Sequence, residues 1–141
     1  MKFDPNNNVV RLCAEGMDLE GQGKPYEASR LFSQAWDEAH DDFERVTAAH
    51  YVARNQANVA DKLRWDETAL DFALRINSSE MNAALPSLYL NVGKGYEDVG
   101  DFDSAKRFYE LALTFVGCLQ EDGYGNMIRA GIAAGIARVS T

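Results

Sequence analysis

One pattern of six residues occurs twice in this chain with the same spacing. Counted from a first glycine, the other five positions follow at offsets of 3, 7, 12, 16 and 19. The first copy consists of Gly16, Leu19, Gly23, Ala28, Phe32 and Ala35, and the second of Gly93, Tyr96, Gly100, Ala105, Tyr109 and Ala112. A repeated unit of this size cannot bury its apolar face alone and has to stack on its neighbours. The repeat therefore predicts an array of similar units with a continuous core.

Apolar residues at helical spacing, together with the positions of glycine and proline, predict about seven helices and no strand. The expected helices cover residues 6–22, 25–39, 40–59, 61–76, 80–100, 102–117 and 123–139. At 141 residues, without a linker or low-complexity stretch, the chain has the length of one domain. We therefore expect a single all-α domain over residues 1–141.

These two-helix units resemble the tetratricopeptide repeat (TPR) family. The segment LYLNVGKGYEDVGDFDSAKRFYELAL, residues 88–113, matches nearly every position of the family pattern, and residues 9–39 match it well except for Pro25 in place of an aromatic residue. The resemblance implies a right-handed α-solenoid of three repeats, at about 6–39, 43–77 and 80–117, with a capping helix at about 123–139.

The middle repeat departs from this pattern at two positions. Arg54 stands where the other repeats have their first glycine, and Asp66 stands where they have the first alanine of the second helix. In this family those two positions pack against each other, so we predict a partly buried ion pair between Arg54 and Asp66. The alternative is a shifted register in which Ala57, Ala69 and Ala73 form the contact.

The resemblance also implies a binding surface, because the first helices of such repeats line a concave groove that holds segments of partner proteins. The groove positions of the first repeat are Cys13, Met17 and Glu20. Those predicted to bind a partner in the later helices are Tyr51, Asn55, Asn58, Leu90, Asn91, Lys94 and Arg129. Asparagine amides donate and accept hydrogen bonds at once, which suits a peptide backbone.

Some members of the family bind a C-terminal carboxylate with two lysines, two asparagines and an arginine. Asn55, Asn91 and Arg129 match three of these positions, whereas Tyr51 and Gly125 replace the lysines. Lys94, one turn from Asn91, could supply part of the missing charge. The alternative is that these are ordinary solvated surface residues.

The last predicted helix is unusually apolar for the end of a solenoid. Its isoleucine stripe, at Ile128, Ile132 and Ile136, is expected to cover the sixth helix. Gly131 and Gly135 would then leave a small-residue side that a second copy or another partner could approach closely, so a homodimer is predicted. The alternative is full burial within one chain.

Composition argues against several classes of function. A net charge of −8 without a basic patch does not suit nucleic acid. The most apolar stretch, residues 128–139, is shorter than the roughly 20 residues that span a bilayer, and no signal peptide is expected. Two cysteines without a CxxC motif favour a reducing compartment, so we expect a cytoplasmic protein. The sequence predicts no metal site and no cofactor.

The predicted function is therefore that of a non-catalytic module that binds a protein or peptide in its groove. A structural homo-oligomer, assembled through the apolar C-terminal helix, is the alternative. An enzyme is a third alternative, for which no nucleophile, metal-ligand set or cofactor loop stands out.

Overall fold

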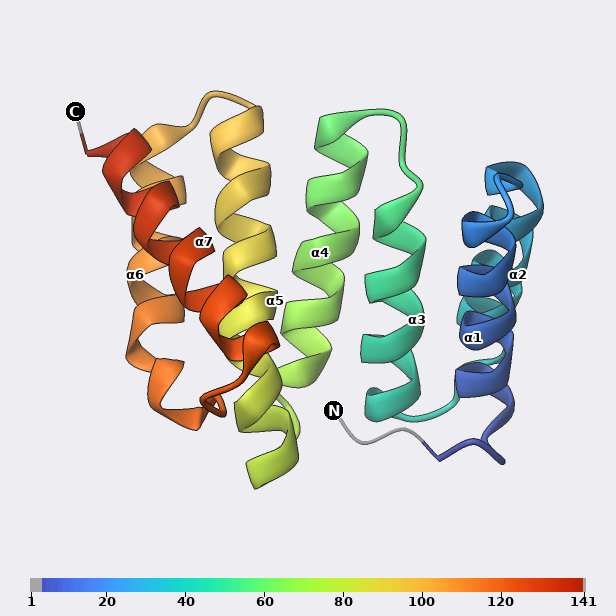
Figure 1. The fold of residues 1–141 in the computed structure, drawn as a ribbon. Coiled ribbons are helices and arrows are strands. Elements are labelled where there is room, and N and C mark those ends of the chain that lie inside the picture. Colours follow the sequence, from blue (N-terminus) through green and yellow to red (C-terminus); the bar gives the residue numbers. More distant parts are fainter. Residues whose placement is uncertain (1–3, 141) are drawn as a thin grey trace. The chain divides into compact units, whose positions relative to one another are not determined.

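The computed structural model describes residues 4–140, and every regular element in this range is helical (Figure 1). The α-helices are α1 (Asn8–Gly21), α2 (Pro25–Glu38), α3 (Asp42–Arg54), α4 (Val59–Ala73), α5 (Ser79–Asp98), α6 (Phe102–Thr114) and α7 (Gly123–Val139), and a short 3-10 helix, η1 (Val116–Cys118), follows α6. The predicted all-α class with seven α-helices is thus confirmed for the described residues.

The helices form two compact units, α1–α4 and α5–α7 with η1, which are described separately. In the first unit α1 packs on α2 and α3 on α4, and both α1 and α2 also contact α3. In the second unit α5 packs on α6, and α7 contacts both of them (Figure 1). The helices therefore pack in adjacent pairs, as the repeat predicts. One repeat domain over residues 1–141 stays a prediction.

Side chains just before the first turn determine where most helices begin. Six helices have an N-cap side chain that accepts a hydrogen bond from the backbone of their first turn, namely Asn7, Asp41, Asn58, Ser78, Asp101 and Asp122. At α3, Asp41 and Glu44 form a complete capping box. This box begins the helix at Asp42, two residues later than the sequence predicts. The remaining helix, α2, begins with Pro25, whose missing N–H costs nothing at a first position.

A glycine contacts an aromatic ring inside two of the helix pairs. A Cβ atom at Gly93 would lie 2.7 Å from Cδ1 of Tyr109, and a Cβ atom at Gly16 would lie 2.8 Å from Cδ1 of Phe32. Both rings are fully buried. The two contacts join α1 to α2 and α5 to α6 at equivalent positions of the sequence pattern. Only glycine permits so close an approach of helix and ring.

The middle pair, α3 and α4, keeps this pattern in its second helix only. Asp66, Leu70 and Ala73 are buried on α4 at the positions of the buried Ala28, Phe32 and Ala35 on α2. On the other helix, Arg54 is the last residue of α3, whereas α1 and α5 each continue five residues beyond the equivalent glycine. Arg54 therefore lies at a helix end, and its side chain is 46% exposed.

The predicted ion pair between Arg54 and Asp66 is wrong. Nη2 of Arg54 lies 3.2 Å from Oε1 of Glu20 on α1, and Oδ2 of Asp66 accepts a hydrogen bond of 2.7 Å from Nζ of Lys62 one turn earlier on α4. Each of the two predicted partners therefore pairs with a different residue, and Arg54 does so from the end of α3. In the alternative register, Ala69 and Ala73 are buried, but Ala57 is exposed in the loop after α3.

Within the second unit, α7 packs on α5 and α6 through the side of the helix that carries its glycines. A Cβ atom at Gly135 would lie 2.6 Å from Cζ of Tyr109, and one at Gly131 would lie 3.2 Å from Cδ2 of Leu90. The prediction that these glycines face a second copy is therefore wrong, because they pack within their own unit. Full burial is wrong as well, since one side of α7 is exposed at Ala130, Ala133, Ala134 and Ala137.

A hydrogen-bond network adds to this attachment of α7. Glu97 on α5 accepts a bond of 2.7 Å from the Tyr109 hydroxyl and two bonds, of 2.8 and 3.1 Å, from the Arg138 guanidinium. The bonds from Arg138 and Tyr109 hold the pKa of Glu97 below its usual value. A charge-assisted contact thus joins α5, α6 and α7 beside the buried ring.

We predict that Gly135→Ala destabilises the second unit. The ring of Tyr109 cannot move aside easily because Gly93 also contacts it and Glu97 holds its hydroxyl. Overpacking of this kind costs about 1–3 kcal/mol, against a gain in helix propensity of about 1 kcal/mol. Urea unfolding followed by circular dichroism measures the difference.

Gly21→Ala is the matched control, since nothing lies within 4 Å of a Cβ atom at Gly21 in α1. It should leave the free energy of unfolding unchanged or slightly raised. Equal stability of the two variants would contradict the close contact at Gly135.

Candidate functional site

In the second unit, several of the predicted groove residues contact other residues of the same unit. Leu90 packs against Gly131 of α7. Lys94 forms an ion pair with Asp98 one turn later. Asn91 is partly buried on α5. The side chains of Leu90 and Lys94 therefore have partners within the unit.

Arg129 is held by the backbone that precedes α7. Its guanidinium donates to the carbonyl oxygens of Val116 at 3.4 Å, Leu119 at 3.0 Å and Gln120 at 3.3 Å. An arginine has five N–H donors and can therefore bond several backbone carbonyls at once. The predicted role of Arg129 in binding a carboxylate therefore competes with a structural role that the sequence did not reveal.

In the first unit, the predicted groove residues of the middle repeat lie on α3 and in the loop that follows it. Asn58 caps α4, with Oδ1 accepting from the backbone of Ala60 at 2.8 Å and of Asp61 at 3.2 Å. Tyr51 is buried and stacks on Phe32, with ring centroids 5.4 Å apart. Asn55 directly follows the end of α3.

The last turn of α3 and the end of α1 together form a polar cluster of five residues. We call it the α3-end cluster, and its members are Glu20, His50, Tyr51, Arg54 and Asn55. Glu20 reaches across from α1 to Arg54. The Arg54 guanidinium carbon lies 5.8 Å from the centroid of the Tyr51 ring, and the His50 ring lies 5.1 Å from it, edge to face. One aromatic side chain is thus bordered by a cation, a histidine and a carboxylate.

Three polar atoms of the α3-end cluster are buried without a hydrogen-bond partner in the protein. They are Oε1 of Glu20, Nδ1 of His50 and Nδ2 of Asn55, and no other described residue that is at least partly buried has such a side-chain atom. The ion pair with Arg54 does not give Oε1 of Glu20 an aligned hydrogen bond. A buried polar atom without a partner costs about 1–3 kcal/mol. The unpaired polar groups of the described chain are therefore concentrated in one place, on two neighbouring helices.

Burial also shifts the pKa values of the ionisable groups in and around the cluster. The pKa of His50 is lowered to about 4, chiefly because burial disfavours the charged ring and further because Arg54 and Lys62 are near. Burial raises the pKa of Cys13 on α1 to about 12, so this thiol is protonated at neutral pH and is a poor nucleophile. The arrangement suits hydrogen bonding and stacking better than covalent chemistry.

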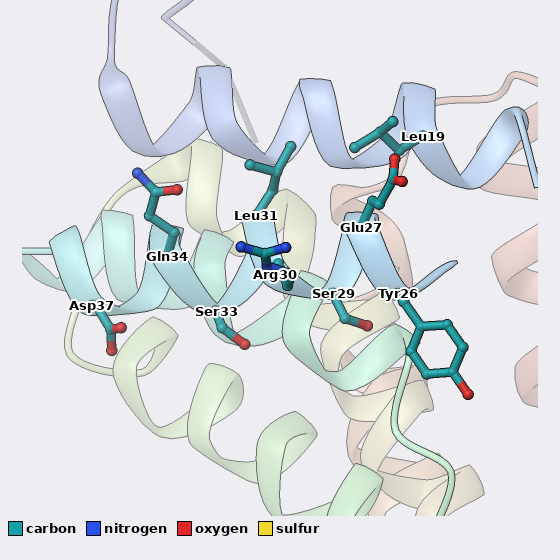
Figure 2. A pocket seen from close by; sticks show the side chains of 9 residues that line it. All are labelled: Leu19, Tyr26, Glu27, Ser29, Arg30, Leu31, Ser33, Gln34 and Asp37. Carbon is teal, nitrogen blue, oxygen red and sulfur yellow. The ribbon is translucent and has the colours of Figure 1, made fainter. Parts of the chain in front are cut away.

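A separate hollow lies on the outer surface of α1 and α2, with a volume of about 730 Å³ (Figure 2). Leu19 contributes from α1, and the other lining residues belong to α2, including Leu31, Arg30 and the largely exposed Tyr26. Apolar, basic, acidic and hydroxyl side chains alternate around it without a common chemistry (Figure 2). This hollow therefore indicates no particular ligand.

Comparisons of the chain with protein-family models, with curated proteins and with solved structures found no match. Within residues 4–140, no group of three or more histidine, cysteine, aspartate or glutamate side chains could hold a metal ion. No helix in the same range is long and apolar enough to cross a bilayer.

The sequence identified Glu20, Tyr51 and Asn55 as groove positions but missed how they are connected. Opposite charges at the ends of two neighbouring first helices, Glu20 and Arg54, were the available signal. The repeat pattern instead suggested a partner for Arg54 within its own helix pair, namely Asp66. The burial of His50 had no signal in the sequence pattern.

We predict that His50 makes the stability of the first unit depend on pH. Between its ordinary pKa of about 6.5 and its native value of about 4, the unfolded chain binds a proton that the native chain does not. The free energy of unfolding should therefore fall as the pH falls through this range, by about 3 kcal/mol in total. Asp66, whose pKa is raised by burial, acts in the opposite direction.

His50→Gln should flatten this dependence when urea unfolding is measured at several pH values between 7 and 4. His40→Gln changes the other histidine, which is exposed, and is the control. An unchanged pH dependence in His50→Gln would show that other groups cause it.

Proposed function

We propose that this protein is a non-catalytic, TPR-like repeat protein that binds a protein or peptide on the face formed by α1 and α3. The equivalent glycine–ring contacts of Gly16 with Phe32 and of Gly93 with Tyr109 support the repeat. In this proposal the repeats at 6–39, 43–77 and 80–117 form a right-handed solenoid, and residues 123–139 form its terminal helix. The two free cysteines support a cytoplasmic location.

The α3-end cluster is the observation that carries the proposed binding function. Nδ2 of Asn55 is a donor without an acceptor, and Oε1 of Glu20 is an acceptor without an aligned donor. A peptide main chain offers both a carbonyl oxygen and an N–H group. Binding would therefore give partners to atoms that cost free energy in the unbound chain.

Neighbouring residues suit the same role. Met17 lies one turn before Glu20 on α1 and is 42% exposed, so it provides an apolar contact for a partner side chain. Tyr51 is fixed by stacking on Phe32 and offers a rigid edge. Rigid aromatic groups surrounded by adaptable polar ones are common in protein interfaces.

A structural homo-oligomer formed through α7 is the second candidate. Tyr124 and Met127 on α7 are 53% and 60% exposed, and the helix contains no acidic residue although the chain has a net charge of −8. A second copy could pack on these exposed apolar side chains without burying a carboxylate of α7. Sedimentation of Met127→Lys against the parent chain distinguishes this candidate, because the substitution should abolish any such oligomer.

We predict that Asn55→Ala weakens peptide binding without loss of stability. Since Nδ2 of Asn55 has no partner in the unbound chain, its removal should leave the free energy of unfolding unchanged or raised. Peptides selected from a random-sequence display library against the whole chain should bind this variant about tenfold more weakly, which corresponds to about 1.4 kcal/mol. Fluorescence polarisation and urea unfolding provide the two measurements.

Gln34→Ala is the control, because Gln34 is exposed on α2 and lies outside the α3-end cluster. It should change neither quantity appreciably. Selected peptides that bind Asn55→Ala and the parent chain equally would place binding elsewhere on the molecule.

A further inference from the structure

The side chain of Arg54 covers the acceptor of the α3-end cluster. Its Nη2 atom lies 3.2 Å from the buried Oε1 of Glu20, while 46% of the Arg54 side chain is exposed. No aligned hydrogen bond accompanies this ion pair. Because the guanidinium is half-exposed, water and salt partly screen the pair, and both side chains lose freedom in forming it. Arg54 is therefore held over Glu20 only loosely.

The same guanidinium also lies near the Tyr51 ring, at 5.8 Å from its centroid. Tyr51 is held in place by stacking on Phe32, and Glu20 is mostly buried, with 19% of its side chain exposed. A carboxylate and the ring of a fixed tyrosine together form a binding position for a cation. In the unbound chain, an arginine of the chain itself fills that position.

The position of Arg54 in the fold leaves its side chain room to move. It is the last residue of α3, and nearly half of its side chain is exposed to solvent. Its departure would uncover Oε1 of Glu20. The cluster would then present a carboxylate acceptor beside the Tyr51 ring.

The charge of the first unit determines which partner chemistry fits. Residues 4–76 contain fourteen acidic and eight basic side chains. An acidic partner would approach both this excess of negative charge and Glu20, whereas a basic partner is attracted by both. Complementarity therefore favours a cationic side chain.

We propose that the partner of this protein inserts an arginine or lysine side chain between Glu20 and Tyr51, displacing Arg54. This inference rests on the proposed binding function of the α1–α3 face. Arg54 is then an internal competitor that occupies the cation position until a partner replaces it. Glu20 binds the incoming charge, Tyr51 contacts its stem, and Asn55 donates to a main-chain carbonyl of the same peptide.

The test compares two short Gly–Ser peptides, identical except for one central residue, which is arginine in one and glutamate in the other. Their binding to the full chain is followed by NMR titration of the backbone amides. Arg54→Met keeps the apolar stem but removes the competing cation, so it should bind the arginine peptide about fivefold more tightly, the equivalent of about 1 kcal/mol. Glu20→Gln should lose this binding.

Two further variants separate the possible outcomes. Arg54→Lys restores a competing cation and should bind like the parent chain, and circular dichroism confirms that each variant is folded. Binding of the arginine peptide to Arg54→Met that is equal, weaker or absent would overturn the proposal, as would Arg54-dependent binding of the glutamate peptide. If library-selected peptides still depend on Asn55 in that case, the binding function stands and only the displacement of Arg54 is wrong.

Discussion

The approach of a glycine to a buried aromatic ring is the contact on which each unit depends. In the second unit, Tyr109 is fully buried and contacts Gly93 on α5 and Gly135 on α7, while its hydroxyl is bonded to Glu97. Three helices thus meet at one side chain. Because a Cβ atom at either glycine would overlap the ring, the positions of α5, α6 and α7 follow from the absence of two methyl groups.

The middle helix pair shows what happens when this contact is missing. Arg54 stands in the place of the glycine, α3 ends at this residue, and the guanidinium extends to Glu20 on the neighbouring helix α1. On α4, Asp66 occupies a buried alanine position and has Lys62 as its partner. A departure from the repeat within one pair therefore creates a polar contact between neighbouring first helices.

This polar contact belongs to the α3-end cluster, in which buried polar atoms lack hydrogen-bond partners. Glu20, His50 and Asn55 have buried polar atoms without aligned partners, and His50 is kept neutral by burial and by the nearby positive charges of Arg54 and Lys62. Such groups lower stability, and proteins retain them where they serve recognition or specificity more often than elsewhere. The proposed function and the proposed displacement of Arg54 both derive from these buried polar atoms that lack partners.

The sequence by itself determined the all-α class, the number of helices and the equivalence of the first and third helix pairs, because helical periodicity and repeat spacing are local properties of the chain. Only the tertiary structure decided the partners of the long charged side chains. Arg54, Asp66 and Arg129 each have partners that no spacing indicated, and Gly135 faces inward although its helix is apolar on several sides. The physical reason is the length of these side chains, because an arginine or lysine can contact any group within several ångströms of its helix. Which group that is depends on where helices end and which faces meet.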